Sequence, residues 1–337
     1  MIFKLALRFI VSLLRTLTTS EEVPMEKEID FFEKLEKRGV SRRDFMRYCT
    51  FLTATMGLSS SFVPKVAEVF AAPAQRPPVV WLQFGECTGC TESLLRSMYP
   101  GIDQLVLEIL SIEYHETIMA AAGKQAEENL HNAVKKYEGK FVCVVEGAVA
   151  TKYDGAYGKI GGKTFLQIAK EVCPKAAAVI CYGTCSSFGG IQAAKPNPGG
   201  YKGVGEAIGI KTLNIPGCPP NPVNLVGTIV SYLLLGKLPA LDNLGRPQFA
   251  FGKTIHDQCQ RRSHFENGEF VKEFGSKEAA MGYCLYKMGC RGPETFNNCP
   301  TAKFNDGTSW PVEAGHPCLG CSEPEFWDKM SPFYQEM

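Results

Sequence analysis

Short apolar runs alternate with amphipathic segments along the middle of the chain. The apolar runs have the length and the flanking turn residues of buried β-strands. They lie at 79–84, 105–110, 141–146, 177–183 and 211–217. Between them, residues 124–137 and 162–172 carry apolar side chains at helical spacing. This alternation predicts an α/β fold with a mostly parallel, doubly wound sheet that has helices on both faces.

The regular pattern fades after residue 239, and cysteines become frequent there. A segment with so little core-forming pattern needs additional cross-links to stay folded, and metal clusters can supply them. We therefore expect three parts: an N-terminal extension with a signal peptide over 1–74, the sheet domain over 75–238, and a mostly irregular domain over 239–337.

The N-terminal part has the order of elements that is typical of a twin-arginine signal. Arg42 and Arg43 precede a moderately apolar stretch at 48–63, and small residues follow at Ala71 and Ala72. The alternative is a chance arginine pair on a soluble helix. A twin-arginine signal predicts a periplasmic protein that is exported after folding, with its cofactors already inserted.

The segment upstream of this signal, 1–17, is too short and too charged to span a bilayer. Met25 makes a plausible start of the signal, so we favour a start codon there over an amphipathic extension. The C-terminal end has no apolar run of 18 residues either. We expect no transmembrane anchor in this chain.

Composition and charge make the cysteines the unusual feature. The chain has 337 residues, a formal net charge of +1 and 45% hydrophobic residues, as an ordinary globular protein has. This charge argues against a nucleic acid or a membrane surface held by bulk electrostatics. The 14 cysteines are a smaller share than the roughly 8–10% of a disulfide scaffold. Their clustering favours metal.

Four thiols follow the predicted strands. They are Cys87, Cys90, Cys185 and Cys218. Parallel sheets bind ligands at the carboxyl ends of their strands, so we expect these thiols to meet at one edge. Four thiolates match the ligand set of a 4Fe-4S cluster, while tetrahedral zinc and two disulfides stay open on ligand type and number.

The remaining cysteines divide into two kinds. Cys143, Cys173 and Cys181 lie inside strand or helix patterns and are interpreted as buried, inert thiols, and Cys49 would leave with the signal. The others cluster after residue 250, together with one histidine three residues before a cysteine, and are candidate metal ligands. These candidates are His256, Cys259, Cys284, Cys290, Cys299, Cys318 and Cys321.

From 79 to 327 the chain resembles the small subunit of a nickel-iron hydrogenase. The motifs that carry this resemblance are CTGCTES, EGAVAT, GTCSSFGG, IPGCPPNP, IHDQC, GYCLYKMGC, GPETFNNCP and WPVEAGHPCLGCSEP. The resemblance implies a flavodoxin-like sheet domain followed by an iron-sulfur domain, with three clusters in a line.

The resemblance also implies which residues hold each cluster. Cys87, Cys90, Cys185 and Cys218 would hold a proximal 4Fe-4S cluster. A medial 3Fe-4S cluster would be held by Cys299, Cys318 and Cys321, with Pro311 where a fourth cysteine would otherwise stand. A distal 4Fe-4S cluster would be held by His256, Cys259, Cys284 and Cys290. The loop 304–310 is one residue longer than is usual, which loosens the placement of Pro311.

Oxygen-tolerant relatives add two cysteines near the proximal cluster, at positions that are Gly89 and Gly190 here. The family pattern therefore implies a conventional, oxygen-sensitive type. In this family an obligate partner, the large subunit, carries the nickel-iron centre that oxidises dihydrogen. Electrons then pass through the small subunit to an acceptor, here expected to be a cytochrome. Glu86 is a candidate proton relay; the alternative is an ordinary loop acid.

Two other functions stay open on the sequence alone. Quinone-reducing respiratory complexes contain a related subunit with only a proximal-type cluster, although the ligands after residue 250 argue against it. A secreted disulfide-rich binding protein is the other alternative.

Overall fold

The computed structural model describes residues 31, 33, 35, 36, 39–71, 76–97, 101, 110–305 and 307–335. The chain forms two compact units. One unit combines Met1–Arg76 with Val226–Pro239, and the other combines Pro77–Leu225 with Ala240–Met337. Since the expected domains 75–238 and 239–337 both fall largely in the second unit, their separation stays a prediction.

The first unit is built from helices. They are α3 (Arg42–Thr55), η1 (Ser60–Phe62), α4 (Val63–Ala71) and the later part of α11 (Pro222–Leu235). The α3 helix begins after Ser41, whose hydroxyl accepts a hydrogen bond from the Asp44 amide at 3.2 Å. The arginine pair opens this helix. Phe45 packs edge-on against Phe70 of α4, with ring centroids 6.0 Å apart.

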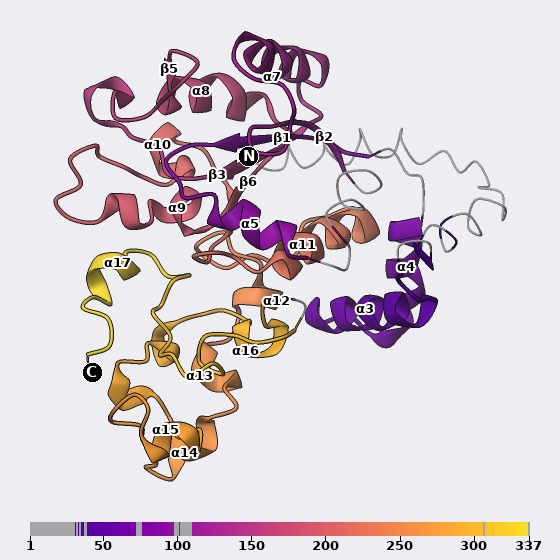
Figure 1. Cartoon of the computed structure of the whole chain (residues 1–337). Coiled ribbons are helices and arrows are strands. Elements are labelled where there is room, and N and C mark those ends of the chain that lie inside the picture. The colour runs from indigo at the N-terminus through magenta and orange to yellow at the C-terminus, as the bar shows by residue number, and fades with distance from the viewer. Residues whose placement is uncertain are drawn as a thin grey trace. The chain divides into compact units, whose positions relative to one another are not determined.

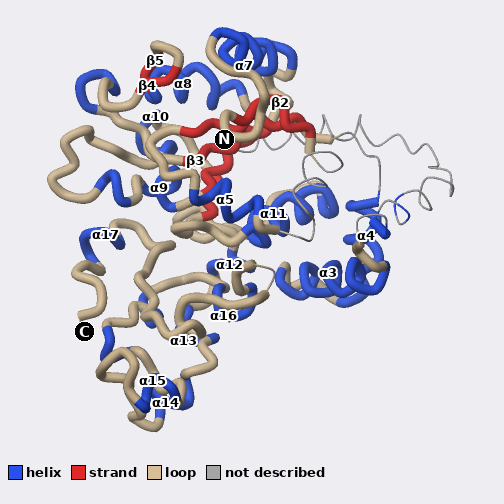
Figure 2. Tube along the Cα trace, in the orientation of Figure 1, coloured by secondary structure: helices blue, strands red, loops and turns tan. Residues whose placement is uncertain are grey.

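The second unit contains the predicted parallel sheet, and its fold class is confirmed. Its strands are β1 (Pro78–Gln83), β2 (Ser111–His115), β3 (Val142–Glu146), β6 (Ala178–Tyr182) and β7 (Leu213–Ile215). They pair in the order β2-β1-β3-β6-β7, and every pairing is parallel. This is the flavodoxin-like order, in which the chain changes direction between β1 and β3. Figure 2 shows the strands in red.

The strand expected at 105–110 lies, apart from its last residue, outside the described residues and stays a prediction. Residues 102–109 lie outside the described part of the chain, and the observed strand β2 begins at Ser111. The sequence 111–115 is SIEYH, and its polar positions hide the strand from a search for apolar runs.

Helices cover both faces of the sheet, with α7 and α8 on one face and α5 on the other (Figure 1). The helices expected at 124–137 and 162–172 are found as α7 (Lys124–Lys136) and α8 (Phe165–Val172). Their buried side chains pack with those of β1, β3 and β6 in one apolar core. The remaining elements before residue 222 are α5 (Gly89–Leu95), η3 (Lys152–Gly155), β4 (Lys159–Ile160), β5 (Lys163–Thr164), η4 (Cys173–Lys175), α9 (Thr184–Phe188), η5 (Ile191–Ala193) and α10 (Val204–Ile208).

The region after residue 240 is mostly irregular, as predicted. Its elements are short: α12 (Gln248–Phe251), α13 (Ile255–Gln258), α14 (Arg262–Glu266), α15 (Lys277–Ala280), η6 (Tyr286–Met288), η7 (Gly292–Glu294), α16 (Cys299–Ala302) and α17 (Phe326–Lys329). Ile255, Leu285 and Trp310 form a small core here, and two predicted ligands, Cys290 and Cys299, are part of it. The candidate metal ligands therefore contribute to the core of this region.

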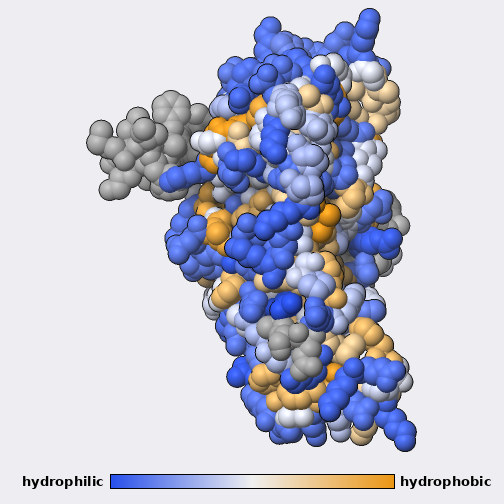
Figure 3. Space-filling model, turned by 90° about the vertical axis from the view of Figure 1, so that its left-hand side faces the viewer, coloured by the Kyte–Doolittle hydropathy of each residue, from blue (hydrophilic) through white to orange (hydrophobic). Residues whose placement is uncertain are grey.

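No helix in the described ranges is long and apolar enough to cross a membrane. On the face drawn in Figure 3, hydrophobic residues form separate patches among hydrophilic ones. Among the large side chains exposed are Ile191, Met281 and Phe274.

Candidate metal centres

The first ligand group forms at the carboxyl edge of the sheet. Cys87 and Cys90 follow β1, Cys185 follows β6, and Cys218 follows β7. The pKa of the Cys90 thiol is raised well above its usual value, chiefly by burial and then by Glu146, with further contributions from the other three thiols. Thiols from three loops that lie far apart in the sequence are thus close enough to affect one another.

Glycine at position 183 allows these loops to approach. Gly183 has φ +107°, and a Cβ built on it would lie 2.5 Å from Cys90 Sγ. Any side chain there would strain the backbone and collide with the ligand sulfur. The β6–α9 turn therefore needs glycine immediately before the segment that carries Cys185.

A buried carboxylate orients the helix that carries Cys90. Glu146 at the end of β3 is fully buried. Its Oε1 accepts hydrogen bonds from the Cys90 and Thr91 amides at 3.1 and 3.2 Å, and its Oε2 accepts from Thr91 Oγ1 at 2.5 Å. These bonds satisfy donors of the first turn of α5 that would otherwise be unpaired. Our sequence interpretation missed this role, although Glu146 follows a central strand at the switch point of the sheet.

Glu86 immediately precedes Cys87 in the ligand loop, and its carboxyl group lies near that of Glu146. Burial, and then the charge of Glu146, raise the pKa of Glu86 to about 7. Its Oε1 accepts a hydrogen bond from Thr88 Oγ1 at 3.2 Å. Its Oε2 is buried without a hydrogen-bond partner in the described structure. The side chain is therefore a partly buried acid that can carry a proton near neutral pH.

The second group consists of Cys299, Cys318 and Cys321. Cys299 is the first residue of α16, and the other two flank the turn at Gly320. Burial raises the pKa of Cys299 well above its usual value, and Cys321 and Cys318 raise it further. Pro311 is exposed and lies in the loop between α16 and Cys318. Its role stays a prediction.

The third group lines a pocket in the irregular region. His256, Cys259, Cys284 and Cys290 line it together, with Arg261 and Tyr286 among the other lining residues. Burial lowers the pKa of His256, and Arg262 lowers it further. A neutral imidazole is the form that binds metal.

The second group lies between the other two. Thr184, which precedes Cys185 of the first group, donates its hydroxyl hydrogen to the Cys321 carbonyl. The Cys318 amide donates to Cys290 Sγ of the third group at 3.3 Å. The second group therefore contacts the loops of both neighbouring groups.

The donor sets fit iron-sulfur clusters. All 14 cysteines are free in the structure. Within the described ranges, no three His, Cys, Asp or Glu side chains meet at a point that one metal ion could occupy. Sets of three or four thiols, and a set of three thiols with one imidazole, are ligand sets that iron-sulfur clusters use, with each ligand on its own iron. Metal binding would also lower the pKa of these thiols, because a thiol that binds metal loses its proton.

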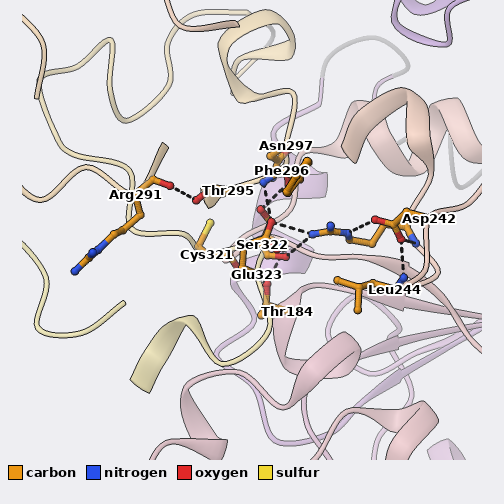
Figure 4. A network of polar contacts seen from close by, with 12 residues as sticks. Thr184, Asp242, Leu244, Arg291, Thr295, Phe296, Asn297, Cys321, Ser322 and Glu323 are labelled. Carbon is orange, nitrogen blue, oxygen red and sulfur yellow. Dashed lines mark hydrogen bonds and ion pairs between the residues drawn. The ribbon is translucent and has the colours of Figure 1, made fainter. Parts of the chain in front are cut away.

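Arg246 anchors the loop that follows Cys321. Its guanidinium donates to Asp242 Oδ2 at 2.7 Å, to Glu323 Oε1 at 2.9 Å and to the Ser322 carbonyl at 3.3 Å. Glu323 Oε1 also accepts from the Phe296 amide at 2.7 Å. Figure 4 shows these residues close to Cys321. The loop is thereby fixed by a buried ion-pair network that the sequence did not reveal.

The other cysteines are buried, as predicted for three of them. Cys143, Cys173 and Cys181 are at most 1% exposed, and the first two sulfurs are 4.0 Å apart. Cys49 is buried in the helical first unit.

Two family descriptions match the sequence. Residues 251–334 match the family described as the C-terminal part of the NiFe/NiFeSe hydrogenase small subunit. Residues 87–232 match the family described as NADH ubiquinone oxidoreductase, 20 Kd subunit. The match over 87–232 is to a subunit of a respiratory complex, which is the alternative that the sequence alone left open. The match over 251–334 contains the ligands of the second and third groups, and these ligands lie outside 87–232.

Curated relatives match along most of their length. The periplasmic [NiFe] hydrogenase small subunit 1 of Nitratidesulfovibrio vulgaris is 54% identical over 90% of this chain and 96% of its own. The quinone-reactive Ni/Fe-hydrogenase small chain of Wolinella succinogenes is 50% identical over 89% of this chain and 85% of its own. Among solved structures, a Ni-Fe-Se hydrogenase chain from Desulfomicrobium baculatum is 36% identical, with a TM-score of 0.74 over 78% of this chain and all of that chain.

Proposed function

The chain belongs to the small subunits of the nickel-iron hydrogenases, and from this premise we propose how its ligand groups perform the work of such a subunit. It is the electron-transfer subunit of a heterodimeric hydrogenase, and its partner is the large subunit. The nickel-iron centre belongs to that partner. The observation that carries the proposal is that the loops of the second ligand group are hydrogen-bonded to loops of both the first and the third group.

We assign one iron-sulfur cluster to each group. Cys87, Cys90, Cys185 and Cys218 would hold the proximal 4Fe-4S cluster, and Cys299, Cys318 and Cys321 would hold the medial 3Fe-4S cluster. His256, Cys259, Cys284 and Cys290 would hold the distal 4Fe-4S cluster. Such clusters take up and release single electrons. The protein supplies the thiols and one imidazole and holds the three groups in order.

Export and partners follow the same reasoning. The arginine pair at the start of α3 supports a twin-arginine signal and export of the folded protein to the periplasm. Cys87 and Cys218 are exposed at the sheet edge, which supports a large, mostly apolar interface with the large subunit around the first group. We expect a cytochrome to accept electrons near the third group.

The first group should hold an ordinary cubane cluster, because Gly89 and Gly190 supply no extra thiolate. Additional thiolates would stabilise a more oxidised cluster, since anionic sulfur favours a higher iron charge. We therefore propose an oxygen-sensitive enzyme. A potentiometric titration should show one proximal transition. Two successive one-electron oxidations of that cluster, or sustained dihydrogen oxidation in air, would overturn this assignment.

Glu86 is our candidate for a proton relay at the partner interface. Its buried, unpaired Oε2 and its neighbour Glu146 support this role. Replacing Glu86 by Gln keeps the shape and removes the exchangeable proton. We expect slower deuterium–proton exchange with unchanged cluster spectra. Wild-type exchange in this variant would leave Glu86 an ordinary loop acid.

The central experiment is co-expression with the large subunit and isolation from the periplasm. We expect a brown heterodimer that reduces dye with dihydrogen and shows the signals of the three clusters. The chain expressed alone should aggregate or contain little iron. A stable, fully loaded monomer would contradict the obligate partnership.

His256 provides the test of the third group. His256→Ala should impair electron exit to the natural acceptor more than deuterium–proton exchange at the partner's centre. His264→Ala is a matched control, because His264 lies in the same region and pairs with Glu269 at 2.6 Å. An unchanged cluster spectrum with wild-type dye reduction and exchange in His256→Ala would make His256 structural only.

A further inference from the structure

The second ligand group is joined to each neighbour by hydrogen bonds between ligand loops. Toward the third group, the Cys318 amide donates to Cys290 Sγ at 3.3 Å, and the Arg291 amide donates to the Cys318 carbonyl at 2.8 Å. Toward the first group, the Thr184 hydroxyl donates to the Cys321 carbonyl. Each boundary is therefore bridged by hydrogen bonds between ligand loops.

One side chain completes the boundary between the first two groups. Thr184 Oγ1 donates to the Cys321 carbonyl and accepts from the Gly217 amide at 2.9 Å. Figure 4 shows Thr184 pointing toward the Cys321 loop. Thr184 precedes Cys185 and Gly217 precedes Cys218, so this hydroxyl connects three ligand loops. Thr184 is 1% exposed, so bulk water is not positioned to replace it.

The two boundaries differ in what a substitution can remove. Between the second and third groups, the bond from Arg291 to Cys318 is made by backbone atoms alone. Between the first and second groups, the corresponding bond to a ligand carbonyl comes from the Thr184 hydroxyl. A single substitution can delete that hydroxyl and leave every ligand in place.

The Cys321 loop is also held from another direction. Arg246 contacts the Ser322 carbonyl and Glu323, the two residues that follow Cys321. With Arg246 in place, loss of the Thr184 bond should shift the loop instead of unfolding it. The expected consequence is a changed spacing between intact groups.

We propose that Thr184 is a positioning residue whose hydroxyl fixes the separation between the first and second ligand groups. The inference rests on the proposed iron-sulfur function. With clusters bound, the one held by the first group would pass single electrons to the one held by the second, with no bond made or broken. Because the rate of such a transfer falls steeply with distance, the hydroxyl would set how fast electrons leave the partner's centre.

The test compares three substitutions in the heterodimer. Thr184→Val and Thr184→Ala remove the hydroxyl, and Thr184→Ser retains it. Thr164→Val is the matched control, because Thr164 is also buried and its hydroxyl caps α8 in the sheet domain. Each protein is assayed for iron content, for spin relaxation of the first group's paramagnetic signal by the second in the reduced state, and for dye reduction against deuterium–proton exchange.

We expect the hydroxyl-free variants to keep their iron and their exchange activity, with dye reduction slowed severalfold and the spin relaxation changed. Thr184→Ser and Thr164→Val should match the wild type. Wild-type relaxation and dye reduction in a fully loaded Thr184→Val or Thr184→Ala protein would overturn the proposal.

Two further outcomes are decisive. If neither hydroxyl-free variant assembles, normal assembly of Thr184→Ser supports the hydroxyl's role and failed assembly of Thr184→Ser overturns it. If the wild-type heterodimer itself contains no clusters, the proposed function fails first and this inference fails with it.

Discussion

The sheet and the irregular region hold their ligands by different physical means. In the sheet, parallel strands end at one edge, and their register brings Cys87, Cys185 and Cys218 together. In the region after residue 240, ligands such as Cys290 and Cys299 pack directly among the apolar side chains of a small core. The difference teaches that the sheet can form before metal binds, whereas the irregular region depends on its ligands for its own stability.

The most severe test of this contrast is removal of a thiol from the small core. Cys299→Ala should lose the medial cluster with its three irons and strongly raise amide hydrogen exchange over residues 255–312, while β1 and β3 stay protected. Cys143→Ala removes the same atoms from the sheet core and should keep the full iron content. Equal loss of protection in both regions of the Cys299 variant would erase the contrast.

Loss of the buried arginine should come next in size. Arg246→Met leaves Asp242 and Glu323 without their cation, and breaking a buried pair in this way costs about 3–5 kcal/mol. The exposed pair between Lys163 and Glu171 gives the control, because Lys163→Met should cost less than about 1 kcal/mol. Thermal unfolding followed by circular dichroism measures both. Similar losses in the two variants would mean that the network around Arg246 is not an anchor.

A pH-dependent loss of stability should arise in the sheet from His115. Burial lowers its pKa to about 4, from a usual value of 6.5. Between these pH values the unfolded chain therefore binds a proton that the folded chain does not bind. The contribution of His115 to the free energy of unfolding is fully present above pH 6.5 and is lost as the pH falls from 6.5 to about 4. The full loss is on the order of 3 kcal/mol.

His115→Phe should remove most of this slope, because phenylalanine can still pack against Trp81, whose ring centroid lies 5.0 Å from that of His115. His131→Gln, on the exposed face of α7, should leave the slope unchanged. Thermal midpoints measured between pH 6.5 and 4.5 decide the matter. An identical slope in the wild type and the His115 variant would assign the acid sensitivity to other groups.

The smallest structural effect is expected from Pro311→Cys. Pro311 is exposed, so its replacement should leave the thermal midpoint nearly unchanged. If its thiol reaches the second group, the medial cluster should become a 4Fe-4S form of lower potential. Electron paramagnetic resonance of the oxidised protein reports the change. A 3Fe-4S signal of undiminished intensity would remove Pro311 from the cluster.

The sequence predicted the sheet better than it predicted the polar contacts around it. Local periodicity predicted α7, α8 and the strands β1, β3, β6 and β7, because the spacing of apolar residues is set within each element. Local periodicity missed β2, because polar residues alternate with apolar ones in its sequence, SIEYH. The candidate ligands came from cysteine clustering and family motifs. Neither source revealed Glu146, Thr184 or Arg246, because their partners lie 55, 137 and 77 residues away in the chain.

Gly89 and Gly190 differ in a way that bears on how such an enzyme could evolve. A Cβ at Gly89 would lie 3.1 Å from Cys87 Sγ, so a small adjustment of that thiol admits a side chain. Gly190 has φ +64°, and a Cβ there would lie 2.5 Å from Cys185 Sγ and 2.8 Å from its Cα. The two substitutions are therefore unequal steps. A lineage could acquire a cysteine at position 89 by one mutation, whereas position 190 becomes accessible only after the turn around it has been rebuilt.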